Sequence, residues 1–370
     1  MRVRRTIIGN LRHTTVLGVA LLALCGTAAP LRVASPARSP ATLARVQADL
    51  SSIKTYLIGK THDIVAGVVR LQAATDTYYA LARADRFDYP MLWTRQPARV
   101  WAAFRQARDA FRYFSPHYEQ VEGIVAGLPA LIPYDVALDS GAPGSGGGGT
   151  VVPFDLHLLD GRVLRKPGNL FSVIESTLWG TYAAYTVPRV TIVPQTGASR
   201  QAVPDANVLK GAADTLARYV AALLRSEEAW RPTVTDAFNC LIINVPTISD
   251  FFTIWRNSRY VMGARATRRD FVARSRLWDI ADNVGSWLVL YHGLSPLVRT
   301  VDPQGDALIM SQLSGLQAFV NGLARREKSG KHFTPEEADL LGAESQNRAT
   351  AITGQIIQVA TELHVPITTA

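Results

Sequence analysis

The sequence predicts an all-α fold made of two helical bundles, with a boundary near residue 231 and one long glycine-rich loop inserted in the first half. Apolar residues recur at helical spacing along most of the chain. Alternating strand-like patterns are limited to residues 151–164 and 189–193. The composition, 48% hydrophobic and 19% charged over 370 residues, can build a large core and excludes a disordered or collagen-like chain.

The first 42 residues differ from the rest. Residues 1–29 carry four arginines and no acid, then an apolar run that ends in small residues. This order is typical of a secretory signal peptide. An uncleaved membrane anchor and a lipid-modified Cys25 remain alternatives, although Leu24 fits lipoprotein processing poorly. Residues 30–42, rich in Pro, Ala, Ser and Arg, are predicted to be a flexible tether.

This leader predicts an exported protein of the periplasm or cell envelope, in contact with a membrane only through its N-terminus or a lipid anchor. It also changes the interpretation of charge. The net charge of +9 includes the four leader arginines, so +5 would remain without them. We therefore expect no nucleic-acid partner. Only Cys25 and Cys240 are present, which excludes a disulfide framework and a cysteine-rich zinc site.

Residues 43–231 are predicted to form the first bundle. Its periodic segments are residues 41–84, 97–114, 116–127, 168–185 and 204–229. Ser115-Pro116 has the pattern of an N-cap and a first-turn proline, so it predicts a helix start. Residues 129–167 are predicted to be a surface loop, because their glycines are not followed by the Lys-Ser or Lys-Thr of a phosphate-binding loop. Asp160-Gly161 predicts a small hairpin within that loop.

Residues 232–370 are predicted to form the second bundle. Its periodic segments lie near residues 233–260, 268–293, 303–328 and 335–364. The last one begins with Thr334, Pro335 and two glutamates, which favour the positive end of the helix dipole. Two basic clusters are interpreted as solvated helix ends or as partners for acids: Arg268, Arg269, Arg274 and Arg276, and Arg325, Arg326, Lys328 and Lys331.

Glu175 is the first candidate site residue. On a helix it falls within an arc of large apolar side chains, namely Phe171, Leu178, Trp179 and Tyr182. A buried carboxylate needs a cation, a donor or a metal, because an unpaired buried charge costs several kcal/mol. The residues alone leave two alternatives open, a structural bond to a neighbouring helix and a role in a site.

Two further acidic segments are candidates. Glu119 and Glu122 are three residues apart and project from one side of a helix, although acids in a first turn also favour the helix dipole without any other role. Asp279 shares a polar face with Asp282, Asn283 and Ser286, which faces either solvent or a groove between bundles. The zinc-protease motif His-Glu-x-x-His and the elbow Gly-x-Ser-x-Gly are both absent from the sequence, so we expect a binding protein and not a hydrolase.

Together these segments carry a family resemblance. The motifs are Tyr118-Glu119-Gln120-Val121-Glu122, Phe171 through Trp179, Leu277-Trp278-Asp279-Ile280 with Asn283-Val284, and Gly293 through Val298. In this order they resemble the imelysin family, which includes EfeO-type periplasmic iron-uptake proteins, over roughly residues 45–365. The resemblance implies two four-helix bundles, an exported protein and a metal site between the bundles. The family has been labelled peptidase-like, but its iron-uptake members act by binding.

One residue departs from the family pattern. The motif is His-x-x-Glu, and this chain has Ser172 in the place of the histidine while Glu175 is retained. Carried over by position, the candidate metal-site residues are Glu119, Glu122, Ser172, Glu175 and Asp279. Without the imidazole, this set suits a hard ion such as Fe(III), Ca(II) or Mg(II) better than Zn(II). His62 and His117 are the candidates to replace the lost ligand.

Two functions follow as hypotheses. The first is metal binding for uptake, with iron as the expected ion and a membrane permease or another envelope protein as the expected partner. The second is a degenerate family member that has lost the metal because of Ser172 and uses the groove for a protein, peptide or polysaccharide.

Overall fold

The computed structural model describes residues 50–145, 149–192 and 199–367. All of them belong to one compact unit, residues 44–370. The predicted leader, Cys25 and the tether lie outside the described residues. The described part is built mainly of α-helices and carries two small two-stranded sheets. This confirms the predicted all-α fold class.

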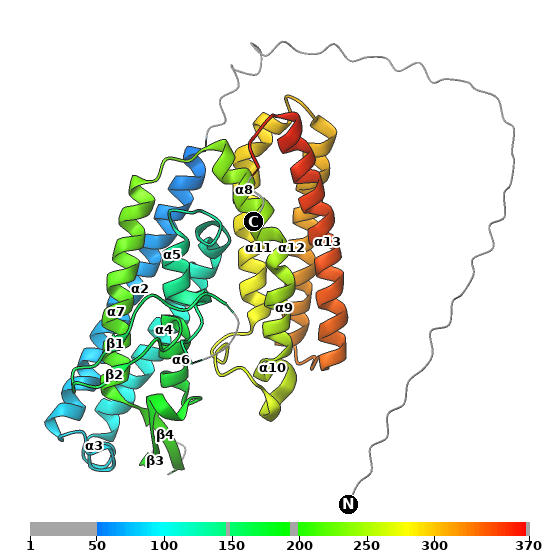
Figure 1. Cartoon of the computed structure of the whole chain (residues 1–370). Helices are drawn as coiled ribbons and strands as arrows, with labels where there is room; N and C mark the ends of the chain where they lie inside the picture. Colours follow the sequence, from blue (N-terminus) through cyan, green and yellow to red (C-terminus); the bar gives the residue numbers. More distant parts are fainter. Residues whose placement is uncertain (1–49, 146–148, 193–198, 368–370) are drawn as a thin grey trace, which may run out of the picture. The chain divides into compact units, whose positions relative to one another are not determined.

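Three long helices dominate the first half: α2 (Ser51–Ala84), α4 (Pro97–Val125) and α7 (Ala206–Ala229). α2 packs along both α4 and α7, and the three lie side by side (Figure 1). The short helix α3 (Tyr89–Arg95), which the sequence analysis did not predict, connects α2 to α4. α6 (Leu170–Trp179) packs against α7 and α4 and completes this half.

The predicted break at Ser115-Pro116 is wrong, because α4 runs through Pro116 without interruption. A proline inside a helix removes one backbone hydrogen bond and normally bends or ends the helix. Here α4 packs against α2 on one side and α11 (Arg276–Val298) on the other. We infer that this packing outweighs the cost of the lost hydrogen bond.

The predicted loop, residues 129–167, contains more structure than expected. It opens with a short helix, α5 (Ile132–Asp135), followed by a π-helical turn, η1 (Val136–Ser140). The hairpin predicted at Asp160-Gly161 is confirmed: β1 (Leu156–His157) pairs with β2 (Val163–Leu164) in antiparallel register. The turn η1 matters most, because it carries an acid into the centre of the molecule.

The predicted helix over residues 168–185 is shorter than expected. α6 ends at Trp179, where Gly180 adopts a left-handed φ of 70° that favours glycine at a helix end. A 3-10 turn, η2 (Ala183–Tyr185), follows, and then β3 (Thr186–Ile192) pairs with β4 (Ser199–Pro204). The strand expected at residues 189–193 is therefore part of a longer one.

The second half contains α8 (Val234–Asn244), η3 (Val245–Thr247), α9 (Ile248–Arg256), α10 (Arg259–Met262), η4 (Gly263–Arg265), α11, α12 (Pro303–Lys328) and α13 (Pro335–Glu362). α12 lies between α11 and α13, and α13 packs on α9 (Figure 1). Within the described residues, only Val234–Arg256 has the length and hydropathy of a membrane span, and 44% of its apolar window is buried in the fold. This burial is what a core helix would show.

Two predicted helices of this half differ in extent. Residues 233–260 are not one helix, because a 3-10 turn that contains Pro246 separates α8 from α9. α11 begins at Arg276, eight residues later than expected, and Ser275 caps it. The predicted start of α13 is confirmed by a complete capping box between Thr334 and Glu337.

The helices of the two halves meet where α4 packs on α11. A side chain at Gly123 of α4 would place its Cβ within 2.6 Å of Trp287 Nε1 on α11. Glycine is therefore required for this close approach. The predicted boundary near residue 231 falls in the non-helical residues 230–233 between α7 and α8, and the division of the chain into two bundles stays a prediction.

Candidate metal site between α4, α6 and α11

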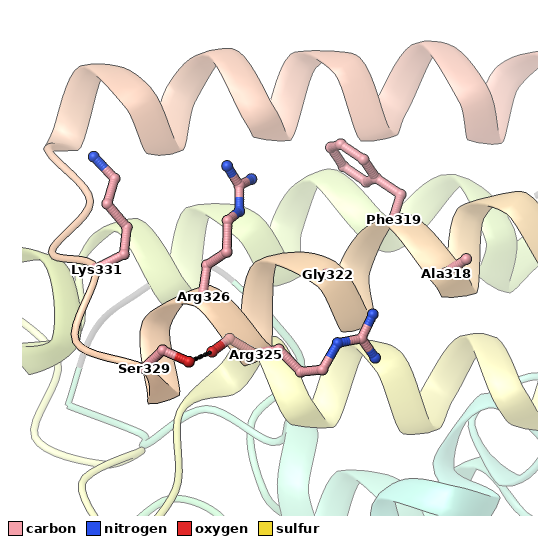
Figure 2. Close-up of a pocket in the computed structure, with 7 residues that line it drawn as sticks. All are labelled: Ala318, Phe319, Gly322, Arg325, Arg326, Ser329 and Lys331. Carbon is pink, nitrogen blue, oxygen red and sulfur yellow. Dashed lines mark hydrogen bonds between the residues drawn. The ribbon is translucent and has the colours of Figure 1, made fainter.

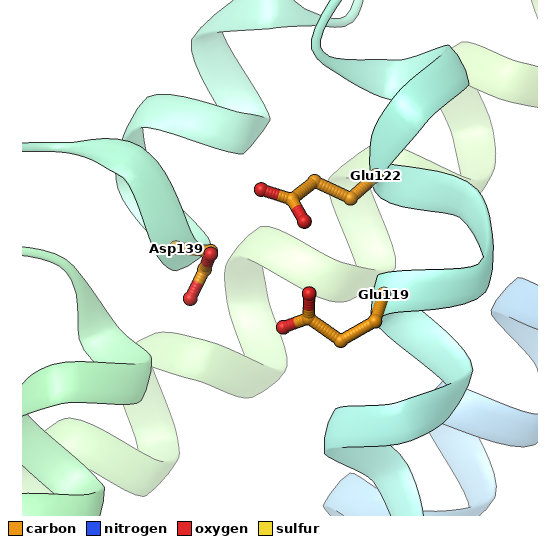
Figure 3. Close-up of side chains that lie close together, drawn as sticks. All are labelled: Glu119, Glu122 and Asp139. Carbon is orange, nitrogen blue, oxygen red and sulfur yellow. The ribbon is translucent and has the colours of Figure 1, made fainter. Parts of the chain in front are cut away.

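Three buried carboxylates converge at the centre of the fold. Glu119 and Glu122 are one turn apart on α4, and Asp139 reaches them from η1 (Figure 3). Their exposed fractions are 1%, 3% and 8%. Each contributes one oxygen to a group in which all oxygens lie within 4.8 Å of one another. We call these three residues the carboxylate cluster.

Arg276, the first residue of α11, places its guanidinium group against this cluster. Its nitrogens lie 2.8 Å from Glu119 Oε2, 3.4 Å from Glu122 Oε1 and 3.5 Å from Asp139 Oδ2. The Asp279 carboxylate, one turn further along α11, lies 3.7 Å from the same guanidinium. The first basic cluster was predicted to contain either solvated helix ends or partners for acids. Arg276 is a partner for acids.

Asn283 supplies the remaining hydrogen bonds. Its Nδ2 donates to Glu122 Oε2 at 2.6 Å and approaches Glu119 Oε2 at 3.4 Å.

A second arginine, Arg274, bridges Asp279 and Asp282 at 3.1 and 2.6 Å. Two guanidinium groups are therefore shared among five carboxylates, which leaves the region with an excess of negative charge.

This excess changes the acidity of the cluster. Burial, together with the charges of Asp279 and other neighbouring carboxylates, raises the pKa of Glu119 well above its usual range. Burial raises the pKa of Asp139 in the same way. Burial also acts to raise the pKa of Glu122, but Arg276 and the hydrogen bond from Asn283 bring it below its usual value. Glu122 is therefore the ionised partner of Arg276, while Glu119 and Asp139 favour a proton or another cation.

Glu175 has a different role from the cluster. Its carboxylate accepts three consecutive backbone N–H groups, from Phe271 at 2.6 Å, Val272 at 2.9 Å and Ala273 at 2.8 Å. The structural alternative left open by the sequence is thus realised, with backbone donors in place of an arginine. Burial raises the pKa of Glu175 to about 8, even though the three N–H groups favour the ionised form. Glu175 anchors the segment that leads into α11.

Most of the predicted site residues surround one small cavity. Its volume is about 20 Å³, and its lining includes Glu119, Ser172, Glu175 and Asp279, together with Asp139 and Arg274. A space of this size accommodates one water molecule or one small ion. Glu122 lies outside this lining and belongs to the carboxylate cluster. The fold thus brings all five predicted residues into one region.

Ser172 lies at the first turn of α6, where Asn169 caps the helix by accepting a hydrogen bond from the Ser172 N–H. Ser172 also borders a much larger groove of about 1040 Å³, which the cluster residues Glu122 and Asp139 line as well. The small cavity and the large groove therefore share residues at Ser172 and Asp139.

Neither of the two histidines considered as replacements belongs to the carboxylate cluster. His62 is exposed on α2. His117 is held by the Tyr113 carbonyl oxygen at 2.7 Å and lies 3.7 Å from Asp63. Their positions give the cluster no imidazole.

Three members of the second basic cluster, Arg325, Arg326 and Lys331, line a separate open groove of about 710 Å³ on α12 and the turn that follows it (Figure 2). Arg325, Arg326 and Lys328 occupy the last turn of α12, where cations favour the negative end of the helix dipole. Lys331 pairs with Glu337 at 2.7 Å. These contacts give the cluster a structural role at a helix end.

Sequence reasoning missed two members of the site. Asp139 lies in a segment predicted to be loop, and no local pattern indicates that η1 would carry it to Glu119 and Glu122. Arg276 was grouped with three other arginines, and only its burial, with 2% exposed, distinguishes it. The sequence offered one signal for Asp139. Asp135 and Asp139 are four residues apart, a spacing that places both acids on one face if the segment is helical.

One comparison with known proteins identifies a family. No curated protein matches the chain. The family model described as imelysin, which is named as a peptidase family, matches residues 53–358, from α2 into α13. The matched range contains every residue of the carboxylate cluster and Arg276. The chain therefore belongs to the imelysin family.

Proposed function

We propose that this protein binds a hard metal cation at the carboxylate cluster of Glu119, Glu122 and Asp139. The observation that carries the proposal is the convergence of three buried carboxylate oxygens within 4.8 Å of one another. Such a group is costly unless protons or a cation balance it, because like charges in a buried site repel strongly. Two arginines shared among five acids leave the rest of that balance to protons or a bound cation.

The donor atoms favour a particular class of ion. Carboxylate oxygens suit Fe(III), Ca(II), Mg(II) and Mn(II), whereas Zn(II) favours imidazole or thiolate ligands. Ser172 provides no imidazole, and the Glu175 oxygens are already engaged by backbone N–H groups. The cluster residues, with Asp279 beside them, would therefore hold the ion, and among these ions iron is the one that the resemblance to iron-uptake proteins favours.

The physiological role that we propose is uptake. The leader predicted for residues 1–29 would export the protein to the periplasm or cell envelope, and the tether would leave the helical unit free to meet a membrane permease or another envelope protein. We propose that the protein acts by binding and release of the cation and not by peptide hydrolysis, since the acids are engaged with arginines, Asn283 and backbone groups and not with a nucleophile.

Calorimetric titration with Fe(II), Fe(III), Ca(II), Mn(II) and Zn(II) tests the proposal. We expect saturable binding of at least one oxygen-preferring ion, weakened at least tenfold in Glu119→Gln. The matched control is Glu344→Gln, which alters an exposed salt bridge to Arg348 on α13. Absence of saturable binding, or equal affinity in wild type and Glu119→Gln, contradicts the proposal.

The second candidate function is a family member that has lost the metal and binds a macromolecule in the groove. Two observations favour it: the groove of about 1040 Å³ is far larger than one ion needs, and a guanidinium group already contacts the acids. The variant Ser172→His separates the two functions. If it creates metal affinity that the wild type lacks, the second function is the better supported.

A further inference from the structure

The binding position of the Arg276 guanidinium, which we call its seat, has an aromatic part formed by Phe251 and Phe271 and an acidic part formed by the carboxylate cluster and Asp279. The guanidinium carbon of Arg276 lies over two aromatic rings, 4.7 Å from the centroid of Phe251 and 4.6 Å from that of Phe271. The guanidinium edges face the carboxylates described above, and the side chain is 2% exposed. Cation–π contacts of this kind stabilise a cation that has lost its water. The seat is therefore built around a positive charge.

The contacts within this seat differ from those of an ordinary structural ion pair. A structural arginine usually forms two parallel hydrogen bonds to one carboxylate. Arg276 instead places single nitrogens near several acids, and only the Glu119 contact, at 2.8 Å, is short. Its Nε, although buried, has no hydrogen-bond partner in the described part of the chain. The guanidinium thus fills the centre of the negative charge without satisfying all its own donors.

The segment before α11 determines where the Arg276 side chain lies relative to the carboxylate cluster. Glu175 binds the N–H groups of residues 271–273, and Ser275 then caps α11 so that Arg276 is its first helical residue. Arg276, Phe251 and Phe271 also line the groove of about 1040 Å³. The groove is therefore the adjoining space that a displaced Arg276 side chain would enter.

From this arrangement we propose that Arg276 is a built-in counter-cation, which neutralises the carboxylate cluster in the cation-free protein and must leave its contacts when a metal ion binds. An arginine cannot lose its proton in a protein, so it and a metal ion compete for the same acids through like-charge repulsion. Arg276 then sets the threshold affinity of the site. This inference rests on the proposed cation-binding function.

The variant Arg276→Met tests it directly. Methionine keeps an unbranched side chain that can contact both aromatic rings, but it removes the competing charge. The probe is Mn(II), whose free aquo ion is measured by its electron paramagnetic resonance signal. We expect Mn(II) to bind the variant at least about tenfold more tightly than wild type, which is about 1.4 kcal/mol.

Two controls separate occupation of the seat from a general change in charge. Arg274→Met removes one positive charge from the same region but leaves Arg276 on the cluster, and we expect it to raise the affinity by clearly less than Arg276→Met does. The double variant Arg276→Met with Asp282→Asn has the net charge of the wild type, because Asp282 pairs with Arg274 outside the cluster. It should keep most of the gain in affinity.

Each outcome of these titrations supports or overturns the proposed role of Arg276. Tighter binding in Arg276→Met that persists in the double variant supports the inference, even if the wild type itself fails to bind, which would contradict the proposed function alone. Equal or weaker binding in Arg276→Met overturns the inference and leaves the proposed function intact if the wild type binds. A gain that Arg274→Met reproduces, or no binding in any variant, also overturns it.

Circular dichroism and thermal denaturation establish that each variant is folded. If Arg276→Met does not fold, Arg276→Lys replaces it, because a lysine keeps the charge but reaches fewer acids than the guanidinium fork. Tighter Mn(II) binding in Arg276→Lys than in wild type supports the inference. Unchanged or weaker binding overturns it.

Discussion

The Arg276 guanidinium donates a hydrogen bond to the Glu119 carboxylate over 2.8 Å, and both side chains are only 2% exposed. The two residues are 157 positions apart and belong to α11 and α4, the helices through which the two halves of the chain meet. Removing either side chain leaves a buried polar partner without its hydrogen bond, at a cost of about 1–3 kcal/mol. The charges of the candidate site are therefore coupled to the contact between the halves.

Neutralising one acid of the cluster should separate stability from cation binding. In Asp139→Asn the repulsion with Glu122 falls, so we expect the cation-free protein at pH 7.5 to gain about 1 kcal/mol or to stay unchanged. The same substitution removes a ligand, so cation affinity should fall. Urea denaturation without metal, and Mn(II) titration of the same sample, measure the two effects. Asp109→Asn, at an exposed acid on α4, should change neither.

Glu175 should behave as a structural anchor for the segment before α11. Glu175→Ala leaves three N–H groups without their acceptor, and each buried unpaired donor costs about 1–3 kcal/mol. We expect a loss of about 3 kcal/mol or more and faster amide exchange at residues 271–273. Glu175→Gln retains one acceptor oxygen and should lose less. Unchanged exchange at these amides in Glu175→Ala would refute the anchor.

The contact between α4 and α11 can be tested through glycine substitutions. At Gly123 a Cβ would clash with Ser286 Oγ and lie 2.6 Å from Trp287 Nε1. We expect Gly123→Ala to destabilise the protein by about 1–3 kcal/mol. Gly59→Ala in α2 is the matched control, because no atom lies within 4 Å of its Cβ. It should stabilise the helix by about 0.5–1 kcal/mol, and equal effects of both substitutions on the melting temperature would argue against close helix packing.

A separate buried acid predicts a pH dependence of stability. Glu227 on α7 is fully buried, and among the described residues Thr61 alone donates a hydrogen bond to its carboxylate, at 2.9 Å. Burial raises the pKa of Glu227 to about 8. The folded state then holds a proton that the unfolded state has lost above pH ~4.5, so this group lowers stability as the pH rises from about 4.5 to 8.

Glu227→Gln removes that dependence. Its stability relative to wild type should be greater at pH 8.5 than at pH 5.5, with a slope of at most about 1.4 kcal/mol per pH unit. Urea denaturation at both pH values gives the difference, and acids of the carboxylate cluster cancel because they are present in both proteins. The exposed, distant Glu344→Gln on α13 should show no such trend. A constant difference across pH would contradict a protonated Glu227.

The sequence predicts helices well where the signals are local. α13 begins at Pro335 with Thr334 as its N-cap, as predicted, and α7 and α12 begin and end within about two residues of the predicted bounds. The prediction at Pro116 is wrong because packing on α2 and α11 outweighs a local helix-start signal. The start of α11 is wrong because Glu175, about a hundred residues earlier in the chain, binds the N–H groups that an earlier helix would use.

For the site, the sequence by itself determined which acids share a helical face, since Glu119 and Glu122 are three residues apart. It also determined that Ser172 stands where the family motif has a histidine. Only the tertiary structure decided that Asp139 joins the cluster, that Glu175 holds backbone amides and that Arg276 faces the acids. Helical signals act within a turn or two of one segment. The balance of buried charge depends on distances of a few ångströms between segments far apart in the chain, and only the fold sets those distances.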